Sequence, residues 1–377
     1  MNKNIKLLFA HKALYDVYFF GAITIPFFVG KGYGVTTALL FASMYMLLSM
    51  VMEVPTGIVG DRYGHKKSVL LGTFMTGVSF FSLILVDNII WDMVWITVFA
   101  ASSALNSGSD TAMIRAASDD FEKDNRTFDY LKSVMLLVSF AGAGFIVNSS
   151  SLDFAIGFSG ALAIAAVVPL LFVAVPAKNK VNTKYTSIIA QVKDLPTALR
   201  KVDGGLSLII LAGLVGAVTF SAKEIISALN TVYDVDIALI GIIAAMAMAG
   251  RIIGTILEKR VQASYRVLLL ILAVLVSATA VIDINNTLGI ILILSSTVIA
   301  QMLFYRLKYK LSYQAPETHV ASLVSGLSLV GRSASGGIIL LVAGFTSLGY
   351  FYLSFVGIAV VLTVVGGFLT TRITQAR

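Results

Sequence analysis

The chain alternates between long apolar segments and short polar ones over its whole length of 377 residues. A helix needs about 20 mostly apolar residues to cross the hydrocarbon core of a bilayer, where the backbone must satisfy its own hydrogen bonds. The pattern therefore predicts an all-α integral membrane protein with twelve transmembrane helices. The predicted spans are 8–29, 36–57, 69–87, 92–113, 131–149, 154–175, 205–230, 237–257, 265–282, 287–306, 320–343 and 349–370.

The longest polar interval, 176–204, follows the sixth predicted helix and divides the chain nearly in half. We expect an N-terminal six-helix bundle at 1–175, a cytoplasmic linker at 176–204 and a C-terminal six-helix bundle at 205–377. Apolar residues recur at helical spacing in the linker, which indicates either a helix lying on the membrane surface or a simple connection. These residues are Tyr185, Ile188, Ile189, Val192, Leu195 and Leu199.

Composition agrees with a membrane protein. Hydrophobic residues make up 58% of the chain and charged residues 13%, whereas a soluble domain carries roughly 25% charged residues. The absence of cysteine excludes disulfides and thiolate nucleophiles, and three scattered histidines predict no metal site. The motifs G-x-x-x-x-G-K-S/T, H-E-x-x-H and G-x-S-x-G do not occur, so neither a nucleotide-driven pump nor a hydrolase is expected.

The net charge of +8 is distributed unevenly between the two sets of predicted loops. With the N-terminus inside, Lys31 is the single Lys or Arg of the exterior loops, and the interior loops are rich in both. Cytoplasmic loops carry such an excess, so both termini are predicted to be cytoplasmic. The basic residues form no single patch, which argues against a nucleic-acid partner.

A short polar motif occurs twice, at the inner end of the second predicted helix of each half. A shift of 197 residues places Gly57 on Gly254, Asp61 on Glu258 and Arg62 on Lys259. A duplicated unit of this kind is typical of secondary transporters, whose ligand site lies at the interface of the repeats.

The first copy, Gly57-x-x-x-Asp61-Arg62-x-Gly64-His65-Lys66, resembles the signature loop of the major facilitator superfamily. The departure is His65, where the family usually has Arg or Lys. The resemblance covers the whole chain and implies two pseudo-symmetric six-helix bundles, transport by alternating access and no enzymatic activity.

Two further patterns, at 53–57 and 107–110, resemble those of bacterial drug and metabolite exporters. The Gly-Pro motif found in the fifth helix of proton antiporters is missing, which weakens an antiporter assignment relative to the superfamily.

The resemblance also implies that the signature loop and its second copy act in gating. Asp61 would face the positive start of the eleventh helix, at 318–320, only when the inner gate is closed. The alternative is that these charges only set the topology. The gating candidates are Gly57, Asp61, Arg62, Gly64, Lys66, Glu258 and Lys259.

Helices one, four, seven and ten line the central cavity in this superfamily, so their polar and aromatic residues are the first binding candidates. Ionisable groups inside a bilayer usually line a cavity or pair with one another. The substrate-binding candidates are Asp16, Phe19, Phe20, Asn106, Asp110, Phe220, Glu224, Gln301, Tyr305 and Arg332. The proton-coupling candidates are Asp16, Glu53, Asp110 and Glu224.

Some of these candidates have structural alternatives. Asn106 and Asp110 are four residues apart and are expected on one face of the fourth helix. Asp110 has Arg115 as an alternative partner near the interface. Lys12 is expected to extend to the inner membrane surface.

We expect proton-coupled export of a small organic or amphipathic solute by a monomer in the lipid of a bacterial cytoplasmic membrane. The expected energy source is the proton gradient, with no cofactor. One alternative is a sugar or organic-anion symporter or facilitator that holds its solute with Arg306 or Arg332, and another is a lipid flippase or a non-transporting sensor on the same scaffold. Arg251 and Arg332 lie deep in predicted spans and need acceptors, either in a bracing ion pair or in a bound anion.

Overall fold

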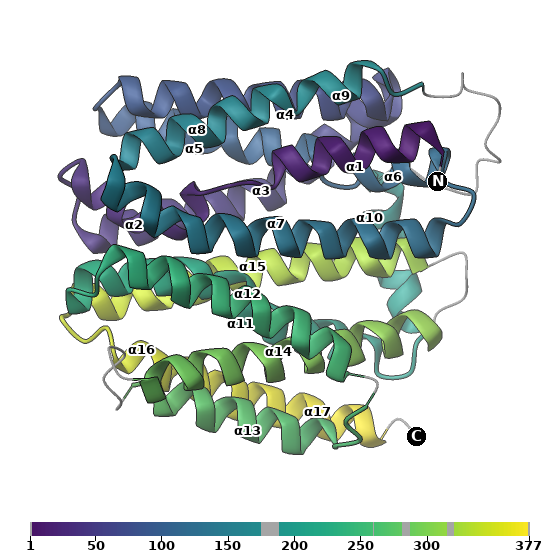
Figure 1. Ribbon diagram of the computed structural model, residues 1–377. Helices are drawn as coiled ribbons and strands as arrows, with labels where there is room; N and C mark the ends of the chain where they lie inside the picture. The colour runs from purple at the N-terminus through teal and green to yellow at the C-terminus, as the bar shows by residue number, and fades with distance from the viewer. Residues whose placement is uncertain (1, 175–187, 259, 281–286, 315–319, 376–377) are drawn as a thin grey trace.

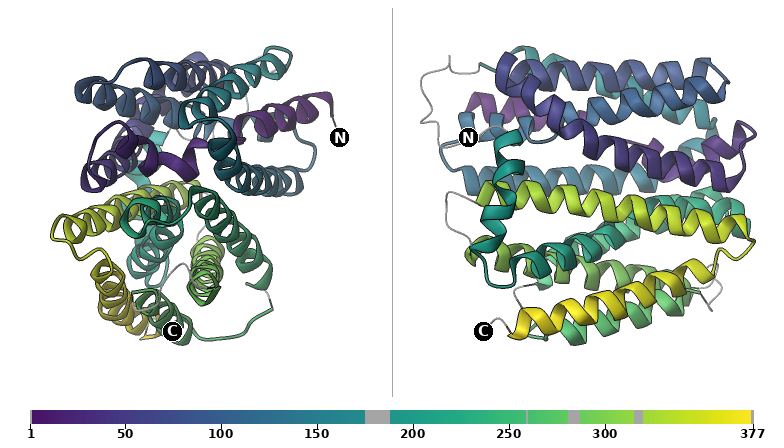
Figure 2. Two further views of the ribbon diagram at one scale, coloured as in Figure 1. Left: turned by 60° about the vertical axis from the view of Figure 1, so that its left-hand side comes forward. Right: turned by 180° about the vertical axis from the view of Figure 1, so that it is seen from behind.

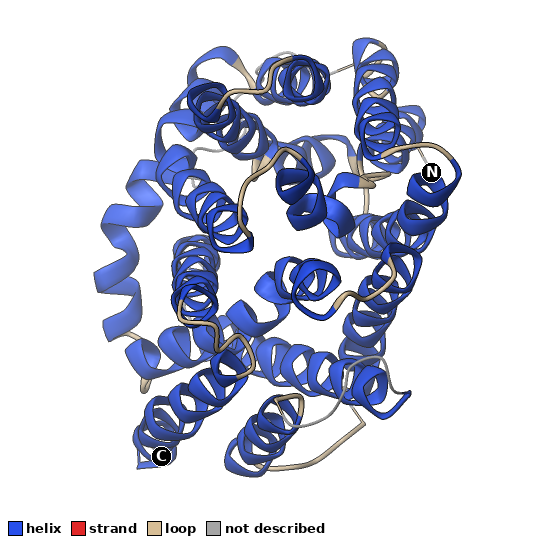
Figure 3. Ribbon diagram, turned by 90° about the vertical axis from the view of Figure 1, so that its left-hand side faces the viewer, coloured by secondary structure: helices blue, strands red, loops and turns tan. Residues whose placement is uncertain are grey.

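The computed structural model describes residues 2–174, 188–258, 260–280, 287–314 and 320–375. Within these ranges the chain forms helices joined by short loops, without a strand (Figure 3). The helices are α1 (Lys3–Tyr15), α2 (Phe20–Gly30), α3 (Val35–Tyr63), α4 (His65–Leu85), α5 (Ile89–Asn106), α6 (Ser109–Ala117), α7 (Phe121–Ser149), α8 (Leu152–Ala165), α9 (Val167–Leu171), α10 (Ile188–Arg200), α11 (Gly205–Tyr233), α12 (Ile237–Leu257), α13 (Tyr265–Ala278), α14 (Thr287–Gln314), α15 (Val320–Ser347), α16 (Leu353–Val361), the π-helical turn η1 (Leu362–Gly366) and α17 (Gly367–Gln375).

In the described ranges, 11 helical segments are long and apolar enough to cross a membrane. This confirms the prediction of an all-helical membrane protein. The predicted ninth span, 265–282, appears as the apolar helix α13, which is shorter at 14 residues. A twelfth crossing therefore stays a prediction.

The first predicted span is two helices, because the chain leaves helical geometry between Asp16 and Phe19. Hydroxyl groups bind two backbone N–H groups at this break. Ser139 Oγ accepts from Tyr18 N at 2.9 Å, and Ser159 Oγ accepts from Phe19 N at 3.1 Å. A buried N–H without a partner costs free energy, so the two serines stabilise the break.

The fourth predicted span is also interrupted. Helix α5 ends at Asn106 and α6 begins at Ser109, and between them Gly108 has φ of +75°, a conformation that favours glycine. The prediction that Asn106 and Asp110 share one helical face is wrong, because that relation requires an uninterrupted helix.

Helix α1 begins and α17 ends at the same end of the molecule, which we call the N/C end, and the opposite end is the far end (Figure 1). Helices α1 to α9 form a first group and α11 to α17 a second group (Figures 1 and 2). Helix α10 lies at the N/C end and contacts α3 and α15, one from each group. The linker is thus helical from Ile188 onward, and Tyr185 lies outside the described residues.

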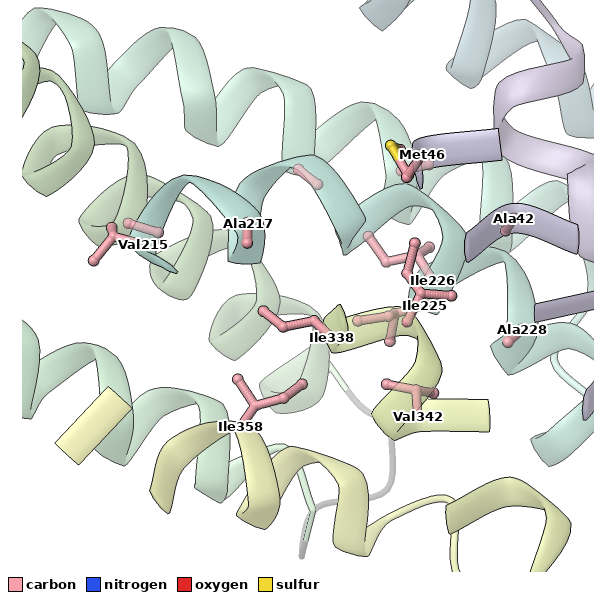
Figure 4. Close-up of a cluster of buried hydrophobic side chains, with 14 of the residues drawn as sticks. Ala42, Met46, Val215, Ala217, Ile225, Ile226, Ala228, Ile338, Val342 and Ile358 are labelled. Carbon is pink, nitrogen blue, oxygen red and sulfur yellow. The ribbon is translucent and has the colours of Figure 1, made fainter. Parts of the chain in front are cut away.

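Two hydrogen bonds join the groups in the far half of the molecule. Ile25 N of α2 donates to Ser227 Oγ of α11 at 3.1 Å, and Ser43 Oγ of α3 donates to the carbonyl of Gly336 in α15 at 3.0 Å. Toward the N/C end, α12 runs away from α7 (Figure 1). Apolar side chains of both groups lie in the same region (Figure 4), among them Ala42, Met46, Ile225, Ile226 and Ala228.

Candidate functional site

A buried lysine joins two of the predicted acids. Lys12 Nζ lies 3.2 Å from Asp16 Oδ2 and 3.5 Å from Asp110 Oδ2. Lys12 is only 5% exposed, and its Nζ lies 4.8 Å from the ring centroid of Phe128. The expectation that Lys12 reaches the membrane surface is wrong, because two carboxylates hold its ammonium inside the protein. Asp110 therefore has Lys12 as a partner, where the sequence suggested Arg115.

Asn106 belongs to a hydrogen-bond network between α1, α4 and α5. Its Nδ2 donates to Tyr15 OH at 2.9 Å, and Thr73 Oγ1 donates to its Oδ1 at 3.4 Å. The Tyr15 hydroxyl lies 3.3 Å from Thr76 Oγ1. These partners all belong to the first group, so the Asn106 amide holds that group together.

Three charges that the sequence analysis did not single out act on the same region. Asp129 and Lys132 of α7 interact electrostatically with Lys12 and Asp110, and Asp129 also interacts with Lys308 of α14. Charges of the two groups of helices therefore act on one another through space. In the sequence, Asp129 and Lys132 are three residues apart just before an apolar run, which would place them on one side of a helix. Charges that only set the membrane topology have the same pattern, so the sequence did not single them out.

Phe19 and Phe20 lie in the core of the first group. Phe20 is 2% exposed and packs edge-on against Phe80 and Trp95, with ring centroids 5.7 and 5.5 Å away. Phe19 stacks on Phe158 at 5.7 Å. The two rings serve packing in this structure, and contact with a solute stays a prediction.

The acid of α11 is also buried. Glu224 is 2% exposed, and one of its oxygens bonds to Nζ of the neighbouring Lys223. Its other oxygen has no hydrogen-bond partner in the part of the chain that the structure describes. One turn earlier, Phe220 packs edge-on against Phe304 of α14 at 5.7 Å.

Arg332 of α15 has its acceptors in the first group. Its Nη2 lies 3.0 Å from Glu53 Oε1 and 3.5 Å from Ser107 Oγ, and Ser107 Oγ donates to Glu53 Oε1 at 3.3 Å. Ser107 lies at the break between α5 and α6, so the three side chains join the two groups. The Glu53–Arg332 pair is a bracing ion pair. It joins Glu53, a proton-coupling candidate, to Arg332, a substrate-binding candidate.

The signature loop joins α3 to α4 through Gly64, whose φ of +100° favours glycine. Lys66 Nζ donates to the carbonyls of Leu171 and Val173 at 2.9 and 2.7 Å, which ties the loop to the end of α9. Gly57 is buried within α3. The loop is therefore anchored to its own group of helices.

The predicted gate contact of Asp61 cannot be followed in the described part of the chain. The side chain of Asp61, the residue Lys259 and the segment 315–319 lie outside it. Arg62 is exposed, and the carbonyl of Glu258 accepts from a guanidinium of α14. The gating roles stay predictions.

Comparison with known proteins identifies the family. The model described as "Major Facilitator Superfamily" matches residues 13–340. The uncharacterized MFS-type transporter YxaM of Bacillus subtilis (strain 168) is 25% identical over 215 residues, which are 55% of this chain and 52% of that protein. The match thus spans about half the length of this relative.

Solved structures share the fold over nearly the whole chain. The peptide transporter POT in complex with sulfate has a TM-score of 0.79 at 13% identity, with coverage of 100% of this chain and 95% of that one. The nucleoside transporter NupG has a TM-score of 0.76 at 14% identity, with coverage of 98% of each chain. The signature loop, the helical architecture and the family match agree: the chain belongs to the major facilitator superfamily, a family of membrane transporters and not of enzymes.

Proposed function

We propose that the protein is a proton-coupled secondary transporter that exports a small organic or amphipathic solute by alternating access. In this proposal two six-helix bundles rock around a central site, and the N/C end faces the cytoplasm. The excess of Lys and Arg in the loops of that end supports this orientation. The divergence of α12 from α7 toward the N/C end supports an inward-facing state.

The observation that carries the proposal is a set of carboxylates inside the protein, of which Asp16 and Glu224 are buried and Asp110 is half-buried, each held by a lysine. Asp16 and Asp110 share Lys12, and Glu224 is bound to Lys223. Glu224 has a second oxygen without a partner among the described residues, so it can take up a proton without losing a protein contact. Loss of its charge would weaken its attraction to the lysine. Proton binding can thereby alter the contacts of α11.

The position of the charges supports export. Asp129, Lys132, Arg251 and Lys308 all lie in the N/C halves of their helices. A solute entering from the cytoplasm would meet these groups first under the proposed orientation. An exporter must capture its solute from that side.

The Glu224→Gln variant is expected to lose proton-driven transport by about tenfold or more, within the usual range of coupling free energies. The amide keeps the shape of the side chain but cannot take up the proton. Solutes that raise the melting temperature of the purified protein would be tested in everted vesicles, where an acidic lumen drives their uptake.

Asp153→Asn is the matched control, because Asp153 is exposed in the first turn of α8. This variant should transport like the parent protein. Proton coupling would be refuted if an acidic lumen drives no flux of any bound solute. Unchanged proton-driven flux in Glu224→Gln would remove this residue from the coupling site.

A further inference from the structure

Three arginines of the second group lie deep enough to hold an anion, and two of them already have acceptors. Arg332 is bound to Glu53 and Ser107. Arg306 Nη1 donates to the carbonyl of Ala263 at 2.6 Å, and its Nη2 donates to that of Glu258 at 3.2 Å. Both guanidinium groups are therefore used to hold the protein's own structure.

Arg251 of α12 differs from these two. Its Nη1 lies 3.7 Å from Met248 Sδ, and its guanidinium carbon lies 5.7 Å from the ring centroid of Phe220. Within the described ranges, no oxygen acceptor binds this guanidinium and no carboxylate lies within ion-pair distance. A half-buried guanidinium presents five N–H donors, so its hydrogen-bonding capacity is free for an oxyanion.

Two glycines bring Arg251 close to α14. A Cβ on Gly254 would lie 2.5 Å from the carbonyl of Val298 and 2.9 Å from Gln301 Cβ, and Gly250 is equally close to α14. Gln301 is 4% exposed, and its Oε1 has no partner among the described residues. The close approach therefore places Gln301, with its unpartnered amide oxygen, opposite Gly254, which is three residues after Arg251 in α12.

Aromatic rings form a wall beside this guanidinium. Phe220 packs edge-on against Phe304 at 5.7 Å, and Phe304 packs edge-on against Tyr305 at 5.6 Å. Tyr305 also interacts electrostatically with Arg251. The ring wall adjoins the charge, so a ligand could place a flat apolar body on the rings and an anionic group on the arginine.

Two cations, Arg251 and Lys308, lie beside this wall. Lys308 Nζ lies 5.3 Å from the ring centroid of Tyr305, on the same wall. Asp129 is the acid that acts on Arg251, and it does so through space from α7. A cation on the ring wall disfavours a cationic ligand at the same place.

We propose that Arg251 binds the carboxylate of a small aromatic acid, whose ring lies on the wall of Phe220, Phe304 and Tyr305. The planar guanidinium fork binds both oxygens of a carboxylate, and such charge-assisted bonds are about twice as strong as neutral ones. This inference rests on the proposed transport function and narrows its solute to organic anions.

Benzoate is the probe, measured by equilibrium binding of the radiolabelled compound to the purified full-length protein at neutral pH. Benzamide and benzylamine, which have nearly the same size but no negative charge, should bind at least about tenfold more weakly. Arg251→Gln should weaken benzoate binding by about 10-fold to 100-fold, and Arg251→Lys should retain part of it. Arg260→Gln, at an exposed position three residues after the end of α12, should bind like the parent protein.

Phe220→Leu provides a second variant that keeps the charge and removes one ring of the wall. It should weaken benzoate binding more than acetate binding. The proposal is overturned if the parent protein shows no saturable benzoate binding, if benzamide binds as tightly as benzoate, or if Arg251→Gln binds benzoate like the parent.

The outcomes also separate this proposal from the transport proposal. Arg251-dependent benzoate binding without any proton-driven flux would leave the anion site standing and refute the transport mechanism. The opposite outcome has two parts: benzoate does not bind, and the parent and Arg251→Gln proteins show equal proton-driven flux of a neutral solute. That outcome would refute the anion site and leave the transport proposal standing.

Discussion

Replacement of Gly144 by valine is expected to reduce transport about 100-fold. The added side chain would overpack the contact at the far end at a cost of roughly 3 kcal/mol, which corresponds to about that factor in an equilibrium constant. Gly144 lies where α7 crosses α12. A Cβ at this position would overlap the Cα of Ala238 and lie 2.6 Å from the carbonyl of Ile237. These are backbone atoms that cannot turn aside, so the helices must separate. The variant should favour the state that is open at the far end.

The matched control is Gly142→Ala on the same helix. A Cβ there would meet only the ring of Phe19, at 3.3 Å, and a side chain can shift by the small distance required. Transport by Gly142→Ala should stay close to that of the parent protein. The state of Gly144→Val would be measured by the reactivity of single cysteines introduced at each end. Parent-like transport and parent-like reactivity would show that the α7–α12 contact is not needed for closure.

Replacement of Lys31 by methionine is expected to lower the free energy of unfolding by about 3–5 kcal/mol, the usual cost of leaving a buried charge without its partner. Lys31 Nζ lies 2.9 Å from Asp92 Oδ1 and donates to the carbonyls of Leu83 and Val86 at 3.0 and 2.9 Å. The side chain of Asp92 is fully buried. Its remaining side-chain partner would be Tyr33, whose hydroxyl donates to Oδ2 at 2.7 Å.

The hydroxyl of Tyr33 keeps its proton at physiological pH. Burial raises the pKa of Tyr33 to about 12, and its hydrogen bond to Asp92 acts in the same direction. One phenol hydrogen bond does not neutralise a buried carboxylate, so the effect of removing Lys31 should remain large.

Asp87→Ala is the control for the same lysine. Asp87 lies 3.4 Å from Lys31 Nζ, but its side chain is 81% exposed, and exposed ion pairs contribute about 1 kcal/mol or less. Denaturant titration of the detergent-solubilised protein would measure all three proteins. Equal losses in Lys31→Met and Asp87→Ala would contradict the assignment of Asp92 as the essential partner.

The sequence alone predicts the helical architecture, because a bilayer leaves few other solutions for apolar runs of this length. The signature at Gly57 to Lys66 indicates the family, and Gly64 indeed takes a backbone conformation that favours glycine. Charges inside a bilayer usually pair, and Asp16 and Asp110 do so, but the sequence did not indicate Lys12 as the partner that they share.

The breaks in the helices could not be predicted in the same way. The break after Asp16 depends on hydroxyls of Ser139 and Ser159, which are more than 100 positions away in the chain. The partners of each deep arginine also depend on residues that are distant in the sequence. Arg332 and Arg251 look alike in the sequence, and only the packing gives one of them an acid and leaves the other beside aromatic rings.

The contacts that close the far half consist of hydroxyl-to-backbone bonds and apolar surface. Ile25 with Ser227, Ser43 with Gly336, and Gly144 with Ala238 involve no formal charge. Separating these surfaces does not require two ions to be pulled apart, so the free energy of opening should vary little between dilute and concentrated salt. The free energy gained by burying apolar surface increases on warming over the physiological range. The contact between the two groups at the far end should therefore become more stable as the temperature rises.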